Sequence, residues 1–357
     1  MIYKFEFRTY YRKFKRPLRT SHGIWDIREG IILRLTDENG QIGWGEIAPL
    51  SWFGSESFEQ ALDFCNELPA HISEETIFAI SSELVACQFG FESALSNSFP
   101  GRAWECFPGG SAACIMEAEP PDLRSQALPG NEAENNRYSG LLPAGETALS
   151  ALQMLWEQGF RTFKWKIGVA VIEEELQVFQ QLVKAMHNLG DGEKALLRLD
   201  ANGGLNYLQA ETWLQTCDNV LEIPNFSVKI EFLEQPLPVP QFDEMLALSA
   251  VYKTPIALDE SVANLDRIQE CYNQGWRGIF VIKPAICGSP SQLRKFCQTH
   301  NIDAVFSSVF ETQIGRQAAL NLATELSLNS RALGFGTDDW FEDKNQETWL
   351  KHLWQQM

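Results

Sequence analysis

The sequence has few of the features that mark nucleic-acid-binding or membrane proteins. Its 29 basic residues are outnumbered by 47 acidic ones, for a formal net charge of −18 in 357 residues. An acidic surface of this size repels the phosphate backbone of nucleic acids. No apolar run approaches the roughly 18–20 residues that a membrane span needs. The sequence therefore argues against nucleic acid and membrane as partners.

The usual cysteine and histidine patterns of zinc and disulfide proteins are also absent. The eight cysteines are scattered without a CxxC pair, and the five histidines are dispersed. This spacing makes a zinc site or a histidine-based metal site improbable. Scattered cysteines in a long acidic chain favour reduced thiols, so we expect a cytoplasmic protein held together by an ordinary hydrophobic core.

The first third of the chain predicts a small α+β domain. Two β-type runs surround an Asn-Gly turn, which is the pattern of a hairpin, and helical periodicity follows. The expected strands cover residues 2–10, 31–35 and 42–47, and the expected helices cover residues 58–68 and 83–95. A stretch rich in Pro and Gly begins near residue 99. We therefore place the end of this capping domain at residue 105.

From about residue 137, short β-type runs alternate with helical runs. The eight strand positions are residues 138–142, 162–167, 195–201, 229–234, 255–259, 278–283, 304–308 and 332–336. Such alternation is typical of a (β/α)8 barrel, with an open doubly wound sheet as the alternative. We expect an α/β fold in which residues 106–336 form a modified TIM-type barrel. Residues 337–357 end in a helix that packs back on the capping domain.

Charged residues stand late in five consecutive strands of this barrel. They are Lys164, Lys166, Asp200, Glu234, Asp259 and Lys283. The intervals between strands match βα units, so these side chains are expected at one height, at the C-terminal mouth where barrels place their chemistry. Any one of them has an ordinary explanation as a cap or a solvated residue. Six together favour a functional site, because burying them without a function would be costly.

The residue types indicate a specific chemistry. Three converging carboxylates, from Asp200, Glu234 and Asp259, would repel one another, and Mg²⁺ is the hard dication that such oxygen ligands suit. Lys164 and Lys166 approach from one side and Lys283 from the other. The combination predicts a metal that binds a substrate carboxylate and an amine that removes the proton alpha to it.

The motifs KWK, LDAN, EQPL, LDES and IKP, in this order, resemble the muconate lactonising subgroup of the enolase superfamily. The longer segments FKWKIG, LRLDANGG, FEQPLP and ALDES most resemble the o-succinylbenzoate synthases within it. The resemblance implies a hydro-lyase that uses Mg²⁺ and acts on a small carboxylate. Its reaction would be the syn-dehydration of 2-succinyl-6-hydroxy-2,4-cyclohexadiene-1-carboxylate to 2-succinylbenzoate, in menaquinone or phylloquinone biosynthesis.

The resemblance also implies a role for each residue. Lys166 is the acid/base, Lys164 assists it, and Lys283 stabilises the enediolate from the other face. The implied metal ligands are Asp200, Glu234 and Asp259. The implied substrate-binding residues are Asn202, Ser307, Ser308, Gly334 and Gly336. Loops near residues 20–25 and 51–55 would close over the substrate and carry the lid residues His22, Trp52 and Phe53.

Two other functions share these motifs. An N-acylamino acid racemase or a dipeptide epimerase also needs amines on both faces of its substrate. The epimerases tend to carry Asp-x-Asp after the eighth strand, whereas residues 336–339 here read Gly-Thr-Asp-Asp. A non-catalytic binding barrel is the third candidate, but a structural cation site has no need of lysines on both sides. The pattern leaves the oligomeric state open.

Overall fold

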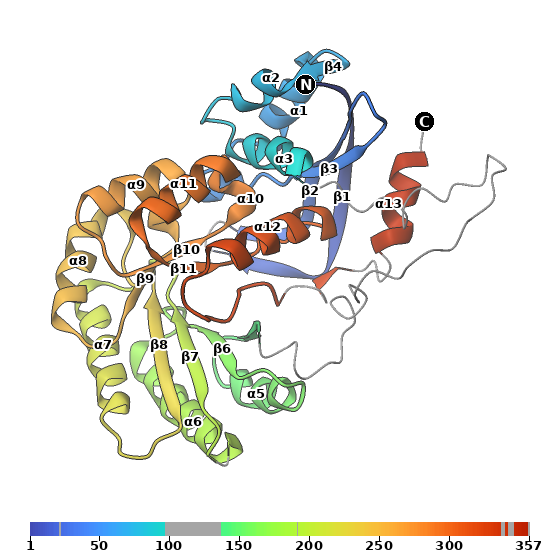
Figure 1. The fold of residues 1–357 in the computed structure, drawn as a ribbon. Helices are drawn as coiled ribbons and strands as arrows, with labels where there is room; N and C mark the ends of the chain where they lie inside the picture. The colour runs from blue at the N-terminus through green and yellow to red at the C-terminus, as the bar shows by residue number, and fades with distance from the viewer. Residues whose placement is uncertain (21–22, 97–136, 191, 337–339, 342–345, 356–357) are drawn as a thin grey trace.

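The structure is a computed structural model that describes residues 1–20, 23–96, 137–190, 192–336, 340–341 and 346–355. A sheet with three helices, formed by the first part of the chain, lies against a larger unit of alternating strands and helices (Figure 1). The predicted domain boundary at residues 105–106 lies outside the described residues, as do His22 and residues 337–339.

The capping domain is built on a long antiparallel hairpin. Its four-stranded sheet has the order β3-β2-β1-β4, and its helices α1 to α3 pack on one face. The strands are β1 (Ile2–Thr20), β2 (Gly23–Thr36), β3 (Ile42–Ile47) and β4 (His71–Ser73), and the helices are α1 (Phe58–Glu67), α2 (Glu74–Phe78) and α3 (Val85–Ser96). A 3-10 turn, η1 (Ser51–Phe53), follows β3.

The first hairpin is longer than the sequence predicted, since β1 runs to Thr20 instead of residue 10. Burial continues to alternate along the strand, with Tyr10, Arg12 and Phe14 inward. An arginine at an inward position hides this alternation from a hydrophobicity pattern. Here the Arg12 guanidinium lies 3.9 Å from the centre of the Phe341 ring, which lets the charged group occupy an inward position.

The glycines of the GWGE segment in β3 have a packing reason. A Cβ on Gly43 would lie 1.8 Å from the Ala94 carbonyl oxygen, and one on Gly45 would lie 2.0 Å from the Gly90 carbonyl oxygen. Helix α3 therefore rests with its backbone directly on β3. Only residues without a side chain allow this contact.

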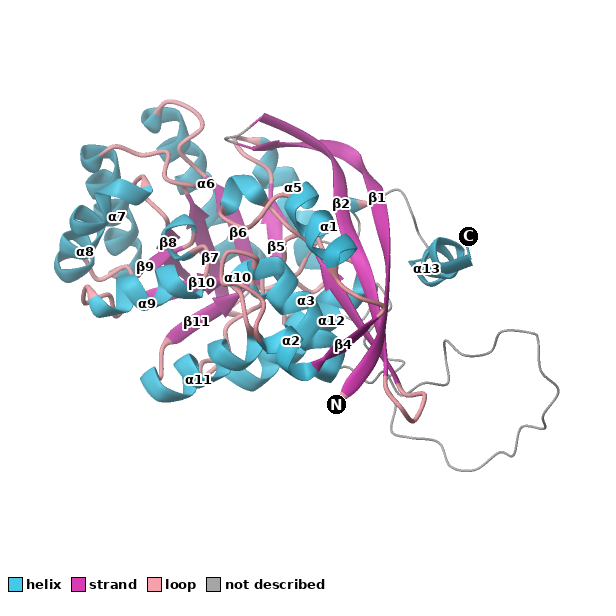
Figure 2. Ribbon diagram, turned by 90° about the horizontal axis from the view of Figure 1, so that it is seen from above, coloured by secondary structure: helices cyan, strands magenta, loops and turns pink. Residues whose placement is uncertain are grey.

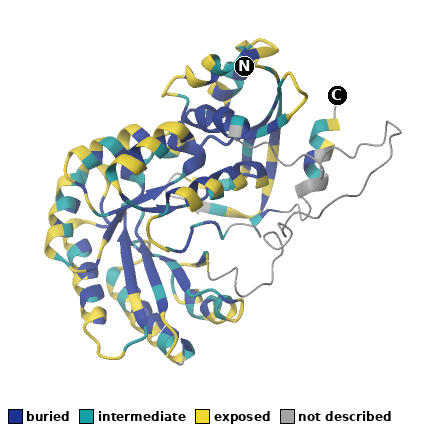
Figure 3. Ribbon diagram, in the orientation of Figure 1, coloured by how far each residue is buried: buried dark blue, intermediate teal, exposed yellow. Residues whose placement is uncertain are grey.

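The second unit is a curved parallel sheet of seven strands in the order β11-β10-β9-β8-β7-β6-β5 (Figure 2). The strands are β5 (Ser139–Leu142), β6 (Thr162–Lys166), β7 (Ala195–Asp200), β8 (Val228–Glu234), β9 (Ile256–Leu258), β10 (Ile279–Ile282) and β11 (Asp303–Phe306). All seven were predicted within a few residues, so the sequence-based fold class is confirmed. The barrel strands are buried while the outer helix faces are exposed (Figure 3).

The predicted eighth strand, residues 332–336, is wrong as a strand. Two isolated bridges replace it, Tyr138 with Leu333 and Ser307 with Gly334. Ser139 N donates to the Leu333 carbonyl at 2.9 Å, and Ser308 N donates to the Gly334 carbonyl at 3.0 Å. The segment thus joins the two edge strands but, with glycines at positions 334 and 336, has too little side-chain packing for a regular ladder.

Helices on the outside of the barrel begin at side-chain caps supplied by the loops at its mouth. Asn206, Asn264, Ser289 and Thr312 cap α7, α9, α11 and α12 respectively. The helices are α5 (Thr147–Glu157), α6 (Ile172–Gly190), α7 (Tyr207–Leu221), α8 (Phe242–Val251), α9 (Leu265–Asn273), α10 (Pro284–Cys287), α11 (Pro290–His300) and α12 (Gln313–Leu326). The 3-10 turns η3 (Val239–Gln241) and η4 (Glu260–Val262) precede α8 and α9.

The last helix, α13 (Gln346–Gln355), lies against the capping sheet. The ring centres of Tyr10 and Trp349 are 5.5 Å apart, and those of Trp44 and Trp354 are 4.8 Å apart. The end of the described chain therefore packs on the domain with which the chain begins. No helix among the described residues is long and apolar enough to span a bilayer.

Candidate active site

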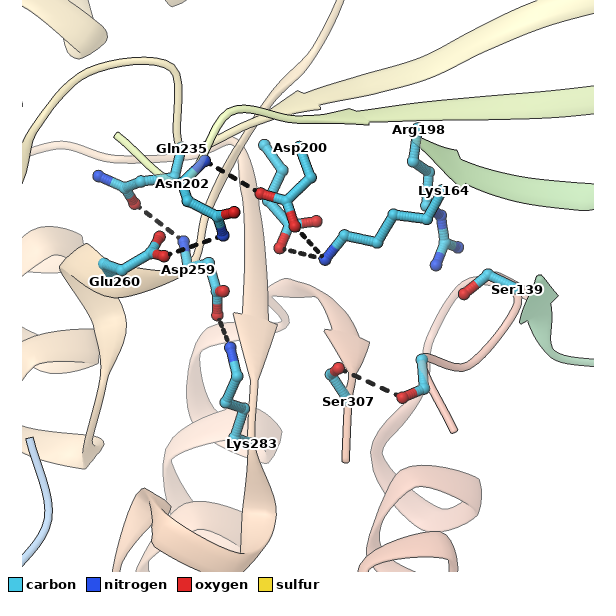
Figure 4. A network of polar contacts seen from close by, with 12 residues as sticks. Ser139, Lys164, Arg198, Asp200, Asn202, Gln235, Asp259, Glu260, Lys283 and Ser307 are labelled. Atoms are coloured by element: carbon cyan, nitrogen blue, oxygen red, sulfur yellow. Dashed lines mark hydrogen bonds and ion pairs between the residues drawn. The ribbon is translucent and has the colours of Figure 1, made fainter. Parts of the chain in front are cut away.

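The predicted charged residues lie at the C-terminal ends of neighbouring strands. Lys166, Asp200 and Glu234 are the last residues of β6, β7 and β8. Asp200 stands opposite Lys166 on one side and Glu234 on the other in the strand register. Asp259 follows β9 and Lys283 follows β10. The register therefore brings the six residues to one end of the barrel, where Figure 4 shows Lys164, Asp200, Asp259 and Lys283.

Two lysines hold the three carboxylates. The Lys164 ammonium lies 2.8 Å from Asp200 Oδ2 and 2.8 Å from Glu234 Oε1, and that of Lys283 pairs with Asp259 (Figure 4). Glu234 and Asp259 are 1% and 3% exposed. Burial disfavours the charged form of Lys164, but the Asp200 and Glu234 carboxylates raise its pKa well above the usual range. Lys164 is therefore a fixed positive charge.

Lys166 differs from the other two lysines. It is half-buried, and no hydrogen bond or ion pair joins its amine to another of the described residues. It lies on the same face of β6 as Lys164, because Trp165 between them is buried on the other face. The sequence assigned proton transfer to Lys166. Of the three lysines at the site, Lys166 is also the one whose amine has no counter-ion within the described chain.

The pKa values of the carboxylates reflect this crowding. Burial, then the neighbouring Asp200 carboxylate, raises the pKa of Glu234 to about 8. Burial also opposes ionisation of Asp200, but the Lys164 ammonium outweighs it and lowers its pKa. Glu260, next to the cluster, has its pKa raised to about 7 by burial and by the Asp259 carboxylate. The cluster holds more negative charge than its lysines neutralise.

This donor set fits Mg²⁺. The side chains offer carboxylate oxygens only, which is the ligand type that Mg²⁺ prefers, and the raised pKa of Glu234 marks a shortage of positive charge. Within the described part of the chain, no three acidic, histidine or cysteine side chains already surround one point. Asp200, Glu234 and Asp259 are instead divided between two ammonium groups, which a bound dication would have to replace.

Two supporting residues were missed by the sequence reasoning. Gln235 is fully buried, and its Oε1 accepts hydrogen bonds from the backbone N of Asp259 (3.0 Å) and of Ser261 (3.2 Å). Glu260 Oε1 accepts from Asn202 Nδ2 at 3.2 Å, and Asn202 N donates to Asp200 Oδ1 at 3.1 Å. Gln235 directly follows Glu234 in the EQP motif, and Glu260 directly follows Asp259 in the DES motif. Their position next to a predicted ligand was the only feature of the sequence that could have indicated their role.

Of the predicted substrate-binding residues, Asn202 lies beside Asp200 and Glu260, whereas the serines and glycines lie at the β11 edge of the mouth. Ser307 Oγ donates to the Gly334 carbonyl at 3.3 Å, and Ser308 Oγ donates to Glu311 Oε2 at 2.9 Å. A Cβ on Gly336 would lie 2.8 Å from the Ser139 carbonyl oxygen. The structure therefore brings Ser307 and Gly334 together, next to the first strand of the barrel.

The predicted lid loop at residues 51–55 reaches the site. The Lys283 ammonium lies 3.9 Å from the centre of the Phe53 ring. Trp52 contacts Trp25 of the hairpin, with ring centres 5.8 Å apart. A Cβ on Gly54 would lie 3.2 Å from Ala263 Cβ, directly after η4. The loop from Ser51 to Gly54 therefore spans the hairpin and the metal-ligand side of the barrel.

Comparisons with known proteins agree with this architecture. Residues 146–351 match the family model "Enolase C-terminal domain-like", and residues 18–98 match "MenC, N-terminal domain". An o-succinylbenzoate synthase of Thermosynechococcus vestitus is 37% identical over 94% of this chain and 93% of its own length. The chain belongs to the o-succinylbenzoate synthase family of the enolase superfamily. The resemblance seen in the sequence motifs is thereby confirmed.

Solved structures of similar proteins have the same fold as this member of the o-succinylbenzoate synthase family. The synthase of Thermosynechococcus elongatus, solved with Mg in its active site, covers 99% of this chain and 100% of its own, with 33% identity and a TM-score of 0.78. The L-Ala-D/L-Glu epimerase of Bacillus subtilis covers 96% of this chain and 91% of its own, with 19% identity and a TM-score of 0.68. At this level of identity, the likeness to the epimerase shows the fold alone.

Proposed function

We propose that the protein catalyses the Mg²⁺-dependent dehydration of 2-succinyl-6-hydroxy-2,4-cyclohexadiene-1-carboxylate to 2-succinylbenzoate. It is a hydro-lyase of the o-succinylbenzoate synthase family. The position of Lys166 supports this assignment of residues. Lys166 ends the strand next to the carboxylate cluster, and its amine has no counter-ion among the described residues. Lys283 faces that cluster from β10.

Asp200, Glu234 and Asp259 are the residues that would hold Mg²⁺. When bound, the ion supplies positive charge that offsets the negative charge developing on the substrate carboxylate. Gln235 fixes the backbone at Asp259, and Asn202 bonds to both Asp200 and Glu260. These bonds orient the ligands before substrate arrives, which is the usual part of such outer residues.

Lys166 serves as both base and acid. Its neutral amine takes the proton from the ring carbon that bears the carboxylate. It then returns that proton to the hydroxyl leaving from the adjacent carbon on the same face. One C–H and one C–O bond break, a ring double bond forms, and water leaves. Lys164, whose ammonium group is held by Asp200 and Glu234, would assist Lys166 from the same face of β6. Lys283 stabilises the developing negative charge from the other face.

The serine and glycine side of the mouth would hold the succinyl arm. Ser307, Ser308 and the backbone of residues 334–336 line the edge of the barrel between Lys283 and the first strand, β5. Phe53 and Trp52 would cover the substrate, since their loop already contacts Lys283. His22 belongs to this proposal by resemblance only.

Turnover of the cyclohexadiene substrate by purified protein tests this function. Formation of 2-succinylbenzoate is followed by absorbance, before and after treatment with EDTA and again after Mg²⁺ is restored. We expect activity to disappear with the metal and to return with it. Unchanged activity in protein shown by elemental analysis to be metal-free would refute the mechanism.

A racemase or epimerase activity is the second candidate. It is favoured by the two amine side chains, Lys166 and Lys283, that approach the cluster from β6 and β10. Incubation of N-succinyl amino acids in D₂O tests it. Rapid exchange of the alpha proton without any dehydration activity would make this the main function.

We also propose a cytoplasmic location. The six cysteines that the structure describes are all free and buried, as expected in a reducing compartment. Fractionation of cells that express the protein, probed with an antibody, checks this placement.

A further inference from the structure

Glu46 is a buried carboxylate that joins the capping sheet to a barrel helix. It lies on β3, is fully buried, and reaches the first turn of α12. Its carboxylate accepts hydrogen bonds from Thr312 N at 2.8 and 2.9 Å and from Gly315 N at 2.9 Å. The Thr312 hydroxyl also donates to it, and so does the Tyr10 hydroxyl at 2.5 Å. Figures 1 and 2 show α12 beside the sheet.

Glu46 receives its hydrogen bonds from a helix end and from Tyr10, and none of them comes from a basic side chain of the described residues. No lysine or arginine of the described chain forms an ion pair with it. The free N–H groups and the positive dipole end of a helix favour an acidic side chain at such a position. Gly315 is needed for this approach, because a Cβ there would lie 2.9 Å from Glu46 Oε2. Glu46 therefore holds the start of α12 in one position relative to the sheet.

The start of α12 is tied directly to the serines of the mouth. Glu311 comes shortly after Ser307 and Ser308 in the chain and is followed at once by the cap residue Thr312. Glu311 Oε2 accepts from the Ser308 hydroxyl at 2.9 Å and from Val309 N at 2.7 Å. A loop closed by these bonds moves as a unit with the helix that follows it.

We propose that Glu46 is a positioning residue for the succinyl arm of the substrate. By holding the first turn of α12 against the capping sheet, it fixes Ser307 and Ser308 at the distance from the metal site that the arm requires. The inference rests on the proposed function and on the proposed role of these serines. It makes the capping domain a determinant of substrate specificity through a residue outside the lid loops.

A second buried glutamate offers a matched control. Glu92, on α3, is 6% exposed, and its Oε2 accepts from Ser291 N at 3.0 Å in the first turn of α11. It makes the same kind of bond between the capping domain and a barrel helix. Helix α11, however, follows β10 and α10, and is separated from the serine loop by β11. If these glutamates served only to dock the capping domain on the barrel, replacing Glu46 and replacing Glu92 would change ligand binding to the same extent.

The test compares Glu46→Gln with Glu92→Gln. Glutamine keeps the size but turns an NH₂ group toward the N–H donors of α12. Binding of 2-succinylbenzoate and of benzoate, which lacks the succinyl arm, is measured by calorimetry with Mg²⁺ present. We expect Glu46→Gln to weaken 2-succinylbenzoate binding about tenfold and to leave benzoate binding and Mg²⁺ affinity unchanged. Glu92→Gln should bind both ligands as the wild type does.

Steady-state kinetics provide the second readout. KM for the cyclohexadiene substrate should rise about tenfold in Glu46→Gln while kcat stays within about twofold. Equal effects of the two variants, or equal weakening of both ligands, would overturn the inference. Should Glu46→Gln not fold, Tyr10→Phe removes one of its hydrogen bonds and should weaken 2-succinylbenzoate selectively by about two- to threefold. A wild type that binds 2-succinylbenzoate but shows no turnover counts against the proposed function, and the binding comparison still decides the inference.

Discussion

The two halves of the barrel mouth are built from different residues. The half formed by the ends of β6 to β10 carries three lysines and the three acidic residues proposed as metal ligands. The half formed by β11 and residues 332–336 carries Ser307, Ser308, Gly334 and Gly336 at the corresponding positions. The first half can move protons and hold a dication, whereas the second can only shape and hydrogen-bond a ligand. In the proposed function, proton transfer and binding of the succinyl arm are therefore separated across one opening.

Of the substitutions that test this division, replacing Lys166 is expected to change activity most. Lys166→Ala removes the amine that has no counter-ion in the described chain, so dehydration should fall by about 10²–10⁴-fold or more, with the unfolding temperature nearly unchanged. Activity is measured at saturating Mg²⁺ and stability by calorimetry. Lys184→Ala, at an exposed position on α6, is the control. A variant that is as active as the control would remove the charged half from the mechanism.

Asp200→Asn should act next most strongly, through the metal. Loss of this carboxylate removes one proposed ligand and one of the two partners of Lys164, so Mg²⁺ affinity should fall by about 10- to 100-fold. Titration calorimetry measures it, with the exposed Asp266→Asn as control. Wild-type affinity in Asp200→Asn would mean that the ion is held elsewhere.

The pH dependence of the charged half follows from Glu234. Its pKa rises from an ordinary 4.5 to about 8 in the folded protein, mainly through burial, so the folded state favours the protonated form. The stability that this group contributes is complete below about pH 4.5 and is lost as the pH rises through about 8. In EDTA the unfolding temperature should therefore decline over this range.

Mg²⁺ should reverse that decline, because the ion binds the ionised carboxylate. The rise in unfolding temperature on adding Mg²⁺ is expected to be larger at about pH 8.5 than at about pH 6, and Glu234→Gln should abolish the difference. A metal effect that is independent of pH in the wild type would contradict the proposed ligand role of Glu234.

The smallest effect is expected from a substitution in the uncharged half of the mouth, which is the half formed by β11 and residues 332–336. Ser307→Ala removes a hydroxyl that donates to the Gly334 carbonyl, so KM should rise about two- to fivefold while kcat and Mg²⁺ affinity stay the same. Ser150→Ala, exposed on α5, is the control. A fall in kcat without a change in KM would place Ser307 in the chemistry and end the division between the halves.

Most of the charged half was predictable from the sequence because βα units repeat at regular intervals. A residue late in one buried run lies at the same height as a residue late in the next, so strand periodicity alone is enough to place Asp200 beside Glu234. Gln235 could not be assigned in this way. Its importance comes from a fold in which its amide faces the backbone of Asp259, 24 residues further along the chain.

The uncharged half and the hairpin were harder to predict. Residues 332–336 resemble a strand in composition, but only their bridges to both edges of the sheet decide that they close the barrel without forming a ladder. Arg12 interrupts the apolar alternation of β1, and its inward position depends on the Phe341 ring from the other end of the chain. Long-range partners of this kind leave no local pattern.

The sequence by itself determined the parallel barrel, the strand ends that carry charge and the kind of metal that such residues suit, since periodicity and ligand chemistry are local properties. Only the tertiary structure decided which lysines of the described chain are paired, that Phe53 covers Lys283, and that Glu46 ties the capping sheet to the serine loop. Those outcomes depend on distances between segments far apart in the chain, which burial and packing settle together.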